Sequence, residues 1–183
     1  MKNMTKLLSD KEVIQKVLDQ ISDKTTDLGD ETWRESVDNY RSEKRFSTEL
    51  DLFQRLPIVF CPSAALAKSG SYVARDVGGV PLLAVRGKDG VVRTFHNSCR
   101  HRGMILAKGS GNASKFICRY HAWAYGLDGN LLNVSGNEGF PDLDKNSHGL
   151  IEVETQEKCG LIFVTQKKAI SDGALASLPT LIS

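Results

Sequence analysis

Four side chains of the types that bind soft metals lie within 23 positions of this 183-residue chain. One residue separates Cys99 from His101, two separate Cys118 from His121, and sixteen lie between the two pairs. Thiolates suit zinc and iron–sulfur clusters, and neutral imidazole binds either metal. Two facing loops that each present one cysteine and one histidine would enclose a metal centre. The spacing therefore predicts a metal site formed by these four residues.

The order of the ligands bears on which metal is bound. Common zinc modules place two cysteines together at one end and two histidines together at the other. Here each pair mixes one cysteine with one histidine, which favours an iron–sulfur centre over a zinc finger. On the residues alone, a zinc-binding module without redox activity stays open as the alternative.

Short strands joined by tight turns must position these loops. Segments rich in Val, Ile, Leu, Tyr and Phe alternate with turn dipeptides such as Asp89-Gly90 and Asp128-Gly129, where glycine accepts the positive φ of a tight hairpin. The pattern predicts a mainly β fold with antiparallel strands. The expected strands are Ile58–Cys61, Tyr72–Val77, Pro81–Arg86, Val91–Asn97, Phe116–Cys118, Ala124–Leu127, Leu131–Val134, Ile151–Thr155 and Leu161–Thr165.

The first 46 residues differ from the rest in being polar and dense in charge. Ser9 with Glu12 three positions later is a possible capping box, followed by apolar residues at helical spacing. These apolar residues are Val13, Ile14, Val17, Leu18 and Ile21. We expect an amphipathic helix that packs on the domain or on a neighbouring subunit. The chain divides into a helical extension (1–46), a β domain (47–170) that opens with a short helix, and a C-terminal tail (171–183).

Composition excludes several classes of protein. Twenty-four basic and 22 acidic residues leave a net charge of +2, too little to indicate nucleic acid or an anionic membrane as the main partner. No run of apolar residues reaches the length of a spanning helix, and the start of the chain turns polar too early for an export signal. We therefore expect a cytoplasmic protein with reduced cysteines, of which Cys61 and Cys159 are buried hydrophobic residues.

Together with their neighbours, the two ligand pairs resemble the Rieske [2Fe–2S] motif. The segments CRHRG, CRYHAW, YGLDGNLLNV and GLIFV are similar to the amino-terminal domain of the large (alpha) subunit of Rieske non-haem iron aromatic-ring-hydroxylating oxygenases. The resemblance implies an antiparallel Rieske-type iron–sulfur domain that holds one [2Fe–2S] cluster per chain. It also implies that Cys99 and Cys118 ligate one iron, and that His101 and His121 ligate the second, which lies nearer to solvent.

Two departures from related patterns lead to further expectations. Cytochrome bc-type Rieske proteins have a disulfide between the cluster loops and a serine hydroxyl aimed at a bridging sulfide, whereas this chain has no further cysteine in either loop and Trp123 at the serine position. We expect Trp123 and Tyr125 to pack beside the cluster, and a potential in the lower part of the roughly −150 to +300 mV Rieske range.

Ala122 replaces the usual glycine after the second histidine. If that position needs a positive φ, the methyl group costs about 1 kcal/mol.

The resemblance implies one-electron transfer from an NAD(P)H-linked reductase, directly or through a ferredoxin, to a mononuclear iron. Such an iron needs two histidines and a carboxylate, and only His96 and His148 remain outside the motif. We therefore expect a truncated or split large subunit of a dioxygenase of aromatic hydrocarbon catabolism, without the catalytic iron domain and without a catalytic residue of its own. A freestanding Rieske ferredoxin-type electron carrier is the alternative.

Local charge indicates the kind of electron donor. Between Cys99 and His121 the chain has five basic residues and no aspartate or glutamate. They are Arg100, Arg102, Lys108, Lys115 and Arg119. Positive charge steers an acidic partner, so a donor ferredoxin or reductase is expected at this surface. A separate catalytic domain or an oligomer partner is expected as well, and no nucleic acid or membrane.

Overall fold

The computed structural model describes residues 8–29 and 31–167. The chain divides into two compact units, residues 1–42 and residues 43–183. The expected C-terminal tail, residues 171–183, lies outside the described residues. No helix in the described ranges is long and apolar enough to cross a membrane.

The first unit contains the predicted amphipathic helix. Helix α1 (Asp10–Asp23) begins with the expected capping box, in which the Glu12 N–H donates to the Ser9 hydroxyl and the Glu12 carboxylate accepts from the Ser9 N–H over 2.7 Å. A second, shorter helix, α2 (Asp38–Arg41), follows. The five apolar side chains of α1 that the sequence analysis names are between 46% and 68% exposed. The helix and its cap are confirmed.

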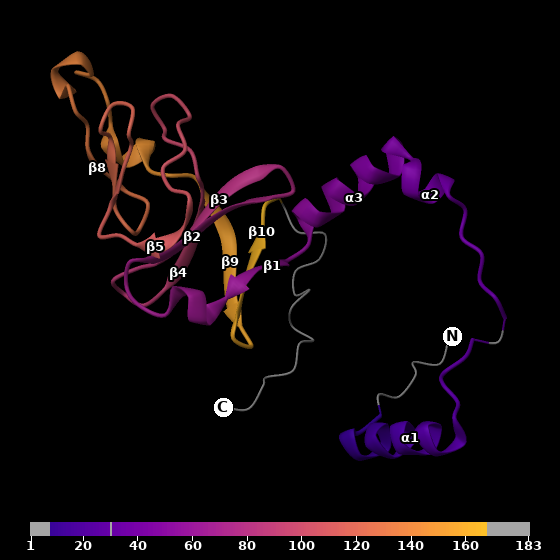
Figure 1. Ribbon diagram of the computed structural model, residues 1–183. Coiled ribbons are helices and arrows are strands. Elements are labelled where there is room, and N and C mark those ends of the chain that lie inside the picture. The colour runs from indigo at the N-terminus through magenta and orange to yellow at the C-terminus, as the bar shows by residue number, and fades with distance from the viewer. Residues whose placement is uncertain (1–7, 30, 168–183) are drawn as a thin grey trace. The chain divides into compact units, whose positions relative to one another are not determined.

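The second unit opens with α3 (Glu43–Arg55), which precedes the first strand (Figure 1). Its C-terminal turn is fixed to the end of the last strand, because the Gln54 carbonyl accepts from the N–H groups of Gln166 and Lys167 over 3.1 and 2.8 Å. The Lys167 ammonium also pairs with Asp51 at 2.9 Å. The short helix predicted at the start of the β domain is present, and it starts earlier in the chain than expected.

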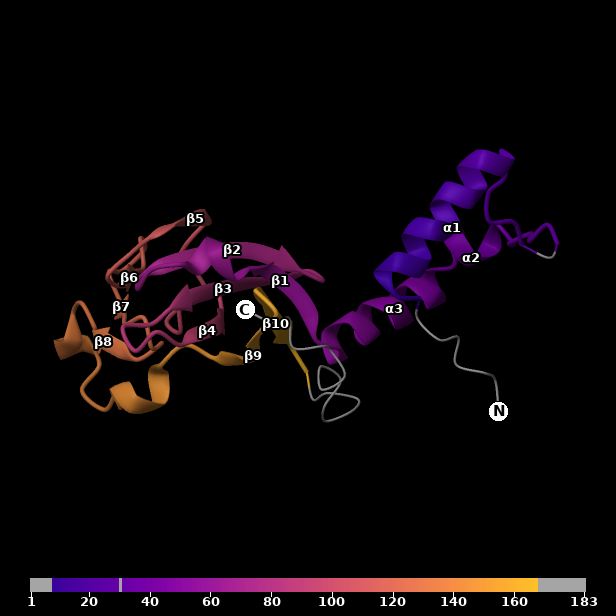
Figure 2. The same ribbon diagram turned by 90° about the horizontal axis from the view of Figure 1, so that it is seen from below.

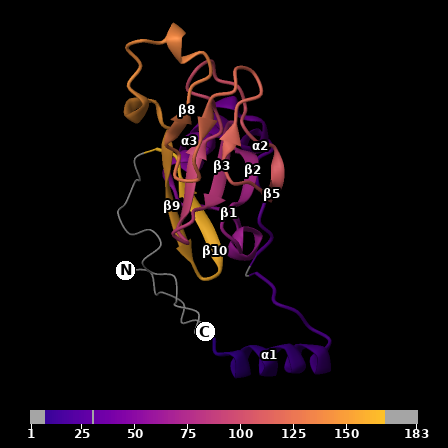
Figure 3. The same ribbon diagram turned by 90° about the vertical axis from the view of Figure 1, so that its left-hand side faces the viewer.

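Within residues 43–167 of this unit, ten antiparallel strands form two sheets. The larger sheet has seven strands in the order β1-β10-β9-β4-β3-β2-β5, and Figure 3 labels these strands except β4. The smaller sheet has three strands in the order β6-β7-β8 (Figure 2). The strands are β1 (Ile58–Pro62), β2 (Ser71–Val77), β3 (Val80–Arg86), β4 (Val92–His96), β5 (Gly109–Asn112), β6 (Phe116–Ile117), β7 (Ala124–Tyr125), β8 (Leu131–Asn133), β9 (Glu152–Lys158) and β10 (Leu161–Thr165). The described part of the unit also has three 3-10 helices: η1 (Ser63–Leu66), η2 (Asn137–Gly139) and η3 (Lys145–His148). The mainly β, antiparallel fold is confirmed.

Each of the nine expected strands is present, and the sequence analysis missed β5. This strand reads Gly-Ser-Gly-Asn and is exposed throughout, so it has none of the apolar alternation that marks the others. It pairs with β2, where Tyr72 lies opposite Gly111. A Cβ atom on Gly111 would come within 3.0 Å of the Tyr72 hydroxyl oxygen. The packing of a residue in another strand therefore favours glycine at this position.

Apolar side chains form two buried clusters. One lies across the seven-stranded sheet and includes Phe60, Leu82 and Ile162. The other lies between the two sheets and includes both motif cysteines together with aromatic residues. Its members are Ala74, Leu83, Val85, Phe95, Cys99, Leu106, Phe116, Cys118, Trp123, Tyr125, Leu127, Leu131, Val134 and Leu150. The cysteines are thus part of the hydrophobic core.

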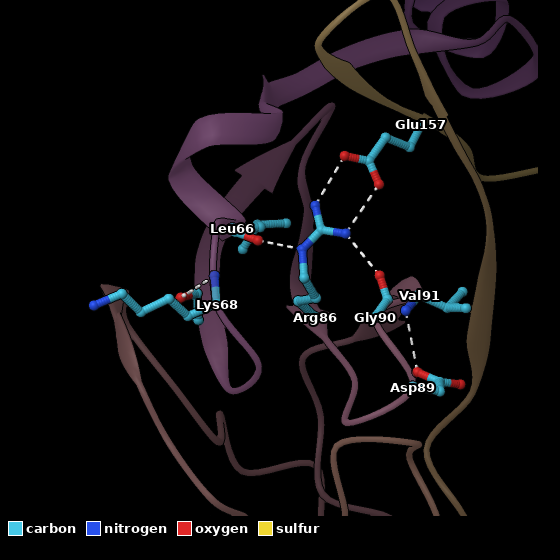
Figure 4. A network of polar contacts seen from close by, with 8 residues as sticks. Leu66, Lys68, Arg86, Asp89, Gly90, Val91 and Glu157 are labelled. Atoms are coloured by element: carbon cyan, nitrogen blue, oxygen red, sulfur yellow. Dashed lines mark hydrogen bonds and ion pairs between the residues drawn. The ribbon is translucent and has the colours of Figure 1, made fainter.

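The side chain of Arg86, whose backbone pairs with Val92 at the start of β4, forms a network of polar contacts (Figure 4). Its guanidinium forms a two-pronged ion pair with Glu157 of β9, over 2.8 and 3.1 Å, and donates to the carbonyl oxygens of Leu66 and Gly90. The bond from Arg86 also lowers the pKa of the Glu157 carboxyl. One side chain thereby joins η1, the β3–β4 turn and β9.

Candidate metal centre

Two loops with the same backbone hydrogen bonds present the predicted ligands. The first ligand loop, residues 99–104, follows β4, and the second ligand loop, residues 118–123, joins β6 to β7. In each loop the cysteine N–H donates to the carbonyl oxygen five residues later, over 2.8 Å in both cases. The residue four positions after the cysteine donates back to the cysteine carbonyl, over 2.8 Å in the first loop and 2.9 Å in the second.

The residue that closes each loop has a left-handed backbone conformation. Gly103 has φ 72° and Ala122, at the matching position, has φ 56°. The positive φ of Ala122 meets the condition under which strain was expected at this position. An alanine methyl group in this region is close to the following carbonyl oxygen, which costs about 1 kcal/mol.

The structure brings the two histidines together and buries the two cysteines. The ring centroids of His101 and His121 lie 4.7 Å apart at an interplanar angle of 61°, and both side chains are half-buried. Cys99 and Cys118 are each only 3% exposed, and neither forms a disulfide. The site therefore has an apolar, sulfur-bearing interior and an imidazole-bearing rim that reaches solvent.

Neighbouring aromatic rings orient the two imidazoles differently. His101 stacks on Trp123 with ring centroids 4.9 Å apart and an interplanar angle of 10°, and the Phe140 ring meets it edge-on at 5.6 Å. His121 stacks on Tyr120 at 3.8 Å. Burial, followed by the charges of His121 and Arg102, lowers the pKa of the His101 imidazole. Since neutral imidazole is the form that binds metals, this environment favours ligation.

The donor set fits a two-iron cluster better than a single ion. Over residues 8–29 and 31–167, no three His, Cys, Asp or Glu side chains converge on a point where one metal ion could be held. A structural zinc ion needs four ligands at about 2.0 to 2.3 Å. In a [2Fe–2S] cluster each iron takes only two protein ligands, so the four residues need not converge. His121 Nδ1 is buried without a hydrogen-bond partner, which is consistent with a nitrogen placed to bind metal.

Tyr125 is a site residue that the sequence analysis assigned only to packing. Its fully buried hydroxyl lies 3.3 Å from Cys99 Sγ and accepts a hydrogen bond from the Arg100 N–H over 2.9 Å. Burial and the bond to Cys99 raise the pKa of the Tyr125 hydroxyl, which therefore keeps its proton. A ligating thiolate has no proton, so Tyr125 would donate to the sulfur. The signal in the sequence is a tyrosine at the inward-facing position two residues after Trp123.

The remaining predicted residues lie as follows. All five basic side chains of the ligand-loop region are exposed. His96 ends β4 and is half-buried, while His148 Nδ1 lies 2.8 Å from the Asp144 carbonyl oxygen and 3.0 Å from the Ser147 hydroxyl. Cys61 is buried as expected, whereas Cys159 is only half-buried and lies in the turn between β9 and β10.

Comparison with known families decides what this arrangement is. Residues 57–144 match the family of the Rieske [2Fe-2S] domain. The chain carries a Rieske [2Fe-2S] domain. Its cofactor is therefore a [2Fe–2S] cluster, and the zinc alternative is set aside.

Curated relatives of this Rieske domain are oxygenase subunits. The carnitine monooxygenase oxygenase subunit of Escherichia coli (strain K12) is 36% identical over 136 residues, which cover 73% of this chain and 36% of that protein. The chlorobenzene dioxygenase subunit alpha of Cupriavidus sp. (strain PS12) is 41% identical over 133 residues, which cover 67% of this chain and 30% of that protein. The Rieske domain is thus homologous to those of Rieske oxygenase alpha subunits, and the chain spans about a third of the length of these relatives.

Solved structures agree with this assignment. The quaternary ammonium Rieske monooxygenase CntA in complex with L-carnitine superimposes with a TM-score of 0.72 at 31% identity, over 79% of this chain and 41% of that chain. Naphthalene 1,2-dioxygenase with bound indole superimposes with a TM-score of 0.64 at 32% identity, over 69% and 29% of the respective chains. The relatives include a carnitine monooxygenase as well as aromatic dioxygenases, so the comparisons do not single out the aromatic class expected from the sequence.

Proposed function

We propose that this chain is the electron-transfer part of a Rieske oxygenase alpha subunit. Residues 47–170 form its Rieske domain, residues 1–46 a helical extension, and residues 171–183 a tail. Electrons arrive from a reductase or ferredoxin and leave toward a mononuclear iron outside these residues, as expected for a truncated or split large subunit. Reduced, liganded thiols suit the cytoplasm. The observation that carries the proposal is the pair of matching ligand loops with adjacent histidine rings.

In this proposal Cys99 and Cys118 hold one iron of the cluster, and His101 and His121 hold the other. When bound, the cluster supplies a one-electron carrier. The apolar side chains around the cysteines exclude water from the sulfur side, while the half-buried imidazoles provide the route by which an electron enters or leaves. Tyr125 donates to the Cys99 sulfur and stabilises its negative charge.

The exposed charges near the ligand loops support an acidic donor. Arg100 and Arg102 flank His101 in the sequence of the first ligand loop, and Arg119 lies two residues before His121 in the second. Long-range attraction between such a patch and an acidic ferredoxin raises the rate of productive encounters. For the complete oxygenase we propose an aromatic hydrocarbon as the substrate.

Anaerobic purification of the chain tests this proposal directly. Iron, acid-labile sulfide and zinc are measured per chain, together with the visible and electron paramagnetic resonance spectra. We expect two irons and two labile sulfides, in the ratio that a [2Fe–2S] cluster requires, and a reduced-state signal with a low average g value. A colourless protein that contains one zinc and no labile sulfide would overturn the assignment.

A further inference from the structure

The two ligand loops are closed at their base in different ways. The second ligand loop is closed by strand pairing, since Ile117 lies opposite Ala124 and Phe116 opposite Tyr125 in the ladder between β6 and β7. The first ligand loop has no such ladder. β4 ends at His96, and the next strand begins only at Gly109. Something else must fix the chain where it enters and leaves this loop.

The side chain of Asn97 occupies that place. Its Nδ2 donates to the Ala107 carbonyl oxygen over 2.8 Å, and its Oδ1 accepts from the N–H groups of Leu106 and Ala107 over 3.0 and 3.2 Å. Its own N–H donates to the Pro81 carbonyl oxygen over 2.8 Å. Asn97 is 3% exposed and is one of three buried polar residues in the described part of the chain. The Asn97 amide thus bonds to Leu106 and Ala107, the segment that returns from the loop, as the peptide group of a neighbouring strand would.

We propose that Asn97 is a positioning residue for the metal centre. Its amide closes the base of the first ligand loop and so fixes Cys99 and His101 relative to the second ligand loop. The role requires a short side chain with both a donor and an acceptor, because Ala107 presents a carbonyl oxygen as well as an N–H. This inference rests on the proposed ligand set, and it adds a residue that is not itself a ligand.

Loss of the amide leaves buried backbone groups without partners. The N–H groups of Leu106 and Ala107 and the carbonyl oxygen of Ala107 have no other hydrogen bond recorded in this part of the structure. Leu106 is buried, so water does not readily replace the lost bonds. The lowest-energy response is a shift of the returning segment, which carries the end of the first ligand loop with it.

Three variants separate a positioning role from packing alone. Asn97→Leu keeps a similar volume and removes every polar contact. Asn97→Asp keeps the shape and both acceptor contacts, but it removes the donation to Ala107 and adds a buried carboxyl group there. Thr94→Val is the matched control, because Thr94 lies in β4 and is fully buried, yet its hydroxyl has no hydrogen-bond partner. Iron and sulfide content, the g values of the reduced cluster, and the rate of cluster loss to a chelator are measured for each.

We expect Asn97→Leu to release its cluster about tenfold faster than the unchanged protein and to shift the g values. Asn97→Asp shows a shift in the same g values, and Thr94→Val leaves both quantities unchanged. Asn97→Ser replaces the leucine variant if the latter is recovered unfolded. Unchanged g values and release rates in folded Asn97→Asp and Asn97→Leu or Asn97→Ser would overturn the inference. Absence of a cluster from the unchanged protein would instead overturn the proposed function.

Discussion

The two ligand loops reach the same backbone geometry from different sequences. The first ligand loop has Gly103 at its left-handed position and depends on a side chain, Asn97, for closure. The second ligand loop has a strained Ala122 at that position and is closed by a strand ladder. The second ligand loop, which strand pairing closes, thus tolerates the conformational strain of Ala122. The first ligand loop, which the Asn97 amide closes, has a glycine that adopts the left-handed conformation without strain.

The histidines of the two loops also differ in their surroundings. His101 lies against Trp123, which is 2% exposed, and against Phe140. His121 stacks on Tyr120, which is 55% exposed. The imidazole of the second loop therefore has the less rigid cover and the easier approach for a partner protein.

Removal of one cysteine from either loop is expected to have the largest effect. In the proposed ligand set each cysteine supplies half of the thiolate ligands of one iron, so Cys99→Ser and Cys118→Ser should both lose most of the bound iron and sulfide. Cys159→Ser, outside both loops, is the control and should retain its cluster. Iron and sulfide analysis checks the result. A variant of either loop that kept a full cluster would show that the loops are not equivalent.

Charge reversal tests which loop the electron donor approaches. Arg100→Glu and Arg119→Glu are each expected to slow reduction by an acidic ferredoxin about tenfold at low salt, because steering is lost. The difference from the unchanged protein should shrink as ionic strength rises. Lys88→Glu, an exposed charge in the β3–β4 turn, is the control. Stopped-flow reduction at several salt concentrations gives the rates. Equal reduction rates for the three variants and the unchanged protein would contradict the proposal that an acidic donor docks at this basic surface.

The Tyr125 hydroxyl lies within hydrogen-bond distance of Cys99 Sγ, in the first ligand loop. Tyr125→Phe removes the donor to Cys99 while keeping the buried ring, so the reduced cluster loses stabilisation. A hydrogen bond worth about 1 kcal/mol to the reduced state corresponds to a potential lower by roughly 40 mV. Protein-film voltammetry measures the shift, and retained iron shows that the site is intact. An unchanged or higher potential would contradict the assigned direction of the bond.

Exchange of the two left-handed residues should have the smallest effect. Ala122→Gly relieves the strain and should raise the free energy of unfolding by about 1 kcal/mol, while Gly103→Ala should lower it by about the same amount. A Cβ atom at Gly103 would meet only the Ser98 hydroxyl oxygen, at 3.7 Å, so the backbone conformation is the main penalty. Urea unfolding of both variants and of the double variant checks the expected cancellation. A loss of stability in Ala122→Gly would show that the methyl group has a packing role.

The sequence predicted most strands and the two loops whose histidine rings the structure brings together, but not the features that depend on distant contacts. Cysteine and histidine are rare and chemically distinctive, so their spacing was informative, and apolar alternation marked the strands. β5 gave no such signal, because it has no apolar side chain and its Gly111 packs against Tyr72 of another strand. Asn97 and Tyr125 were missed as hydrogen-bonding residues because their partners, Ala107 and Cys99, lie 10 and 26 residues away.

The burial of Cys99 and Cys118 has a consequence for how the protein acquires iron and sulfide. Both sulfur-bearing side chains lie in the same apolar cluster as Phe116 and Trp123, with almost no surface open to solvent. A maturation factor that delivers the inorganic atoms must therefore reach the thiols before the smaller sheet closes over them, or during a local opening of it. Assembly of the cofactor is thus tied to the closing of this apolar cluster, and slow opening of the finished apoprotein would limit its repair.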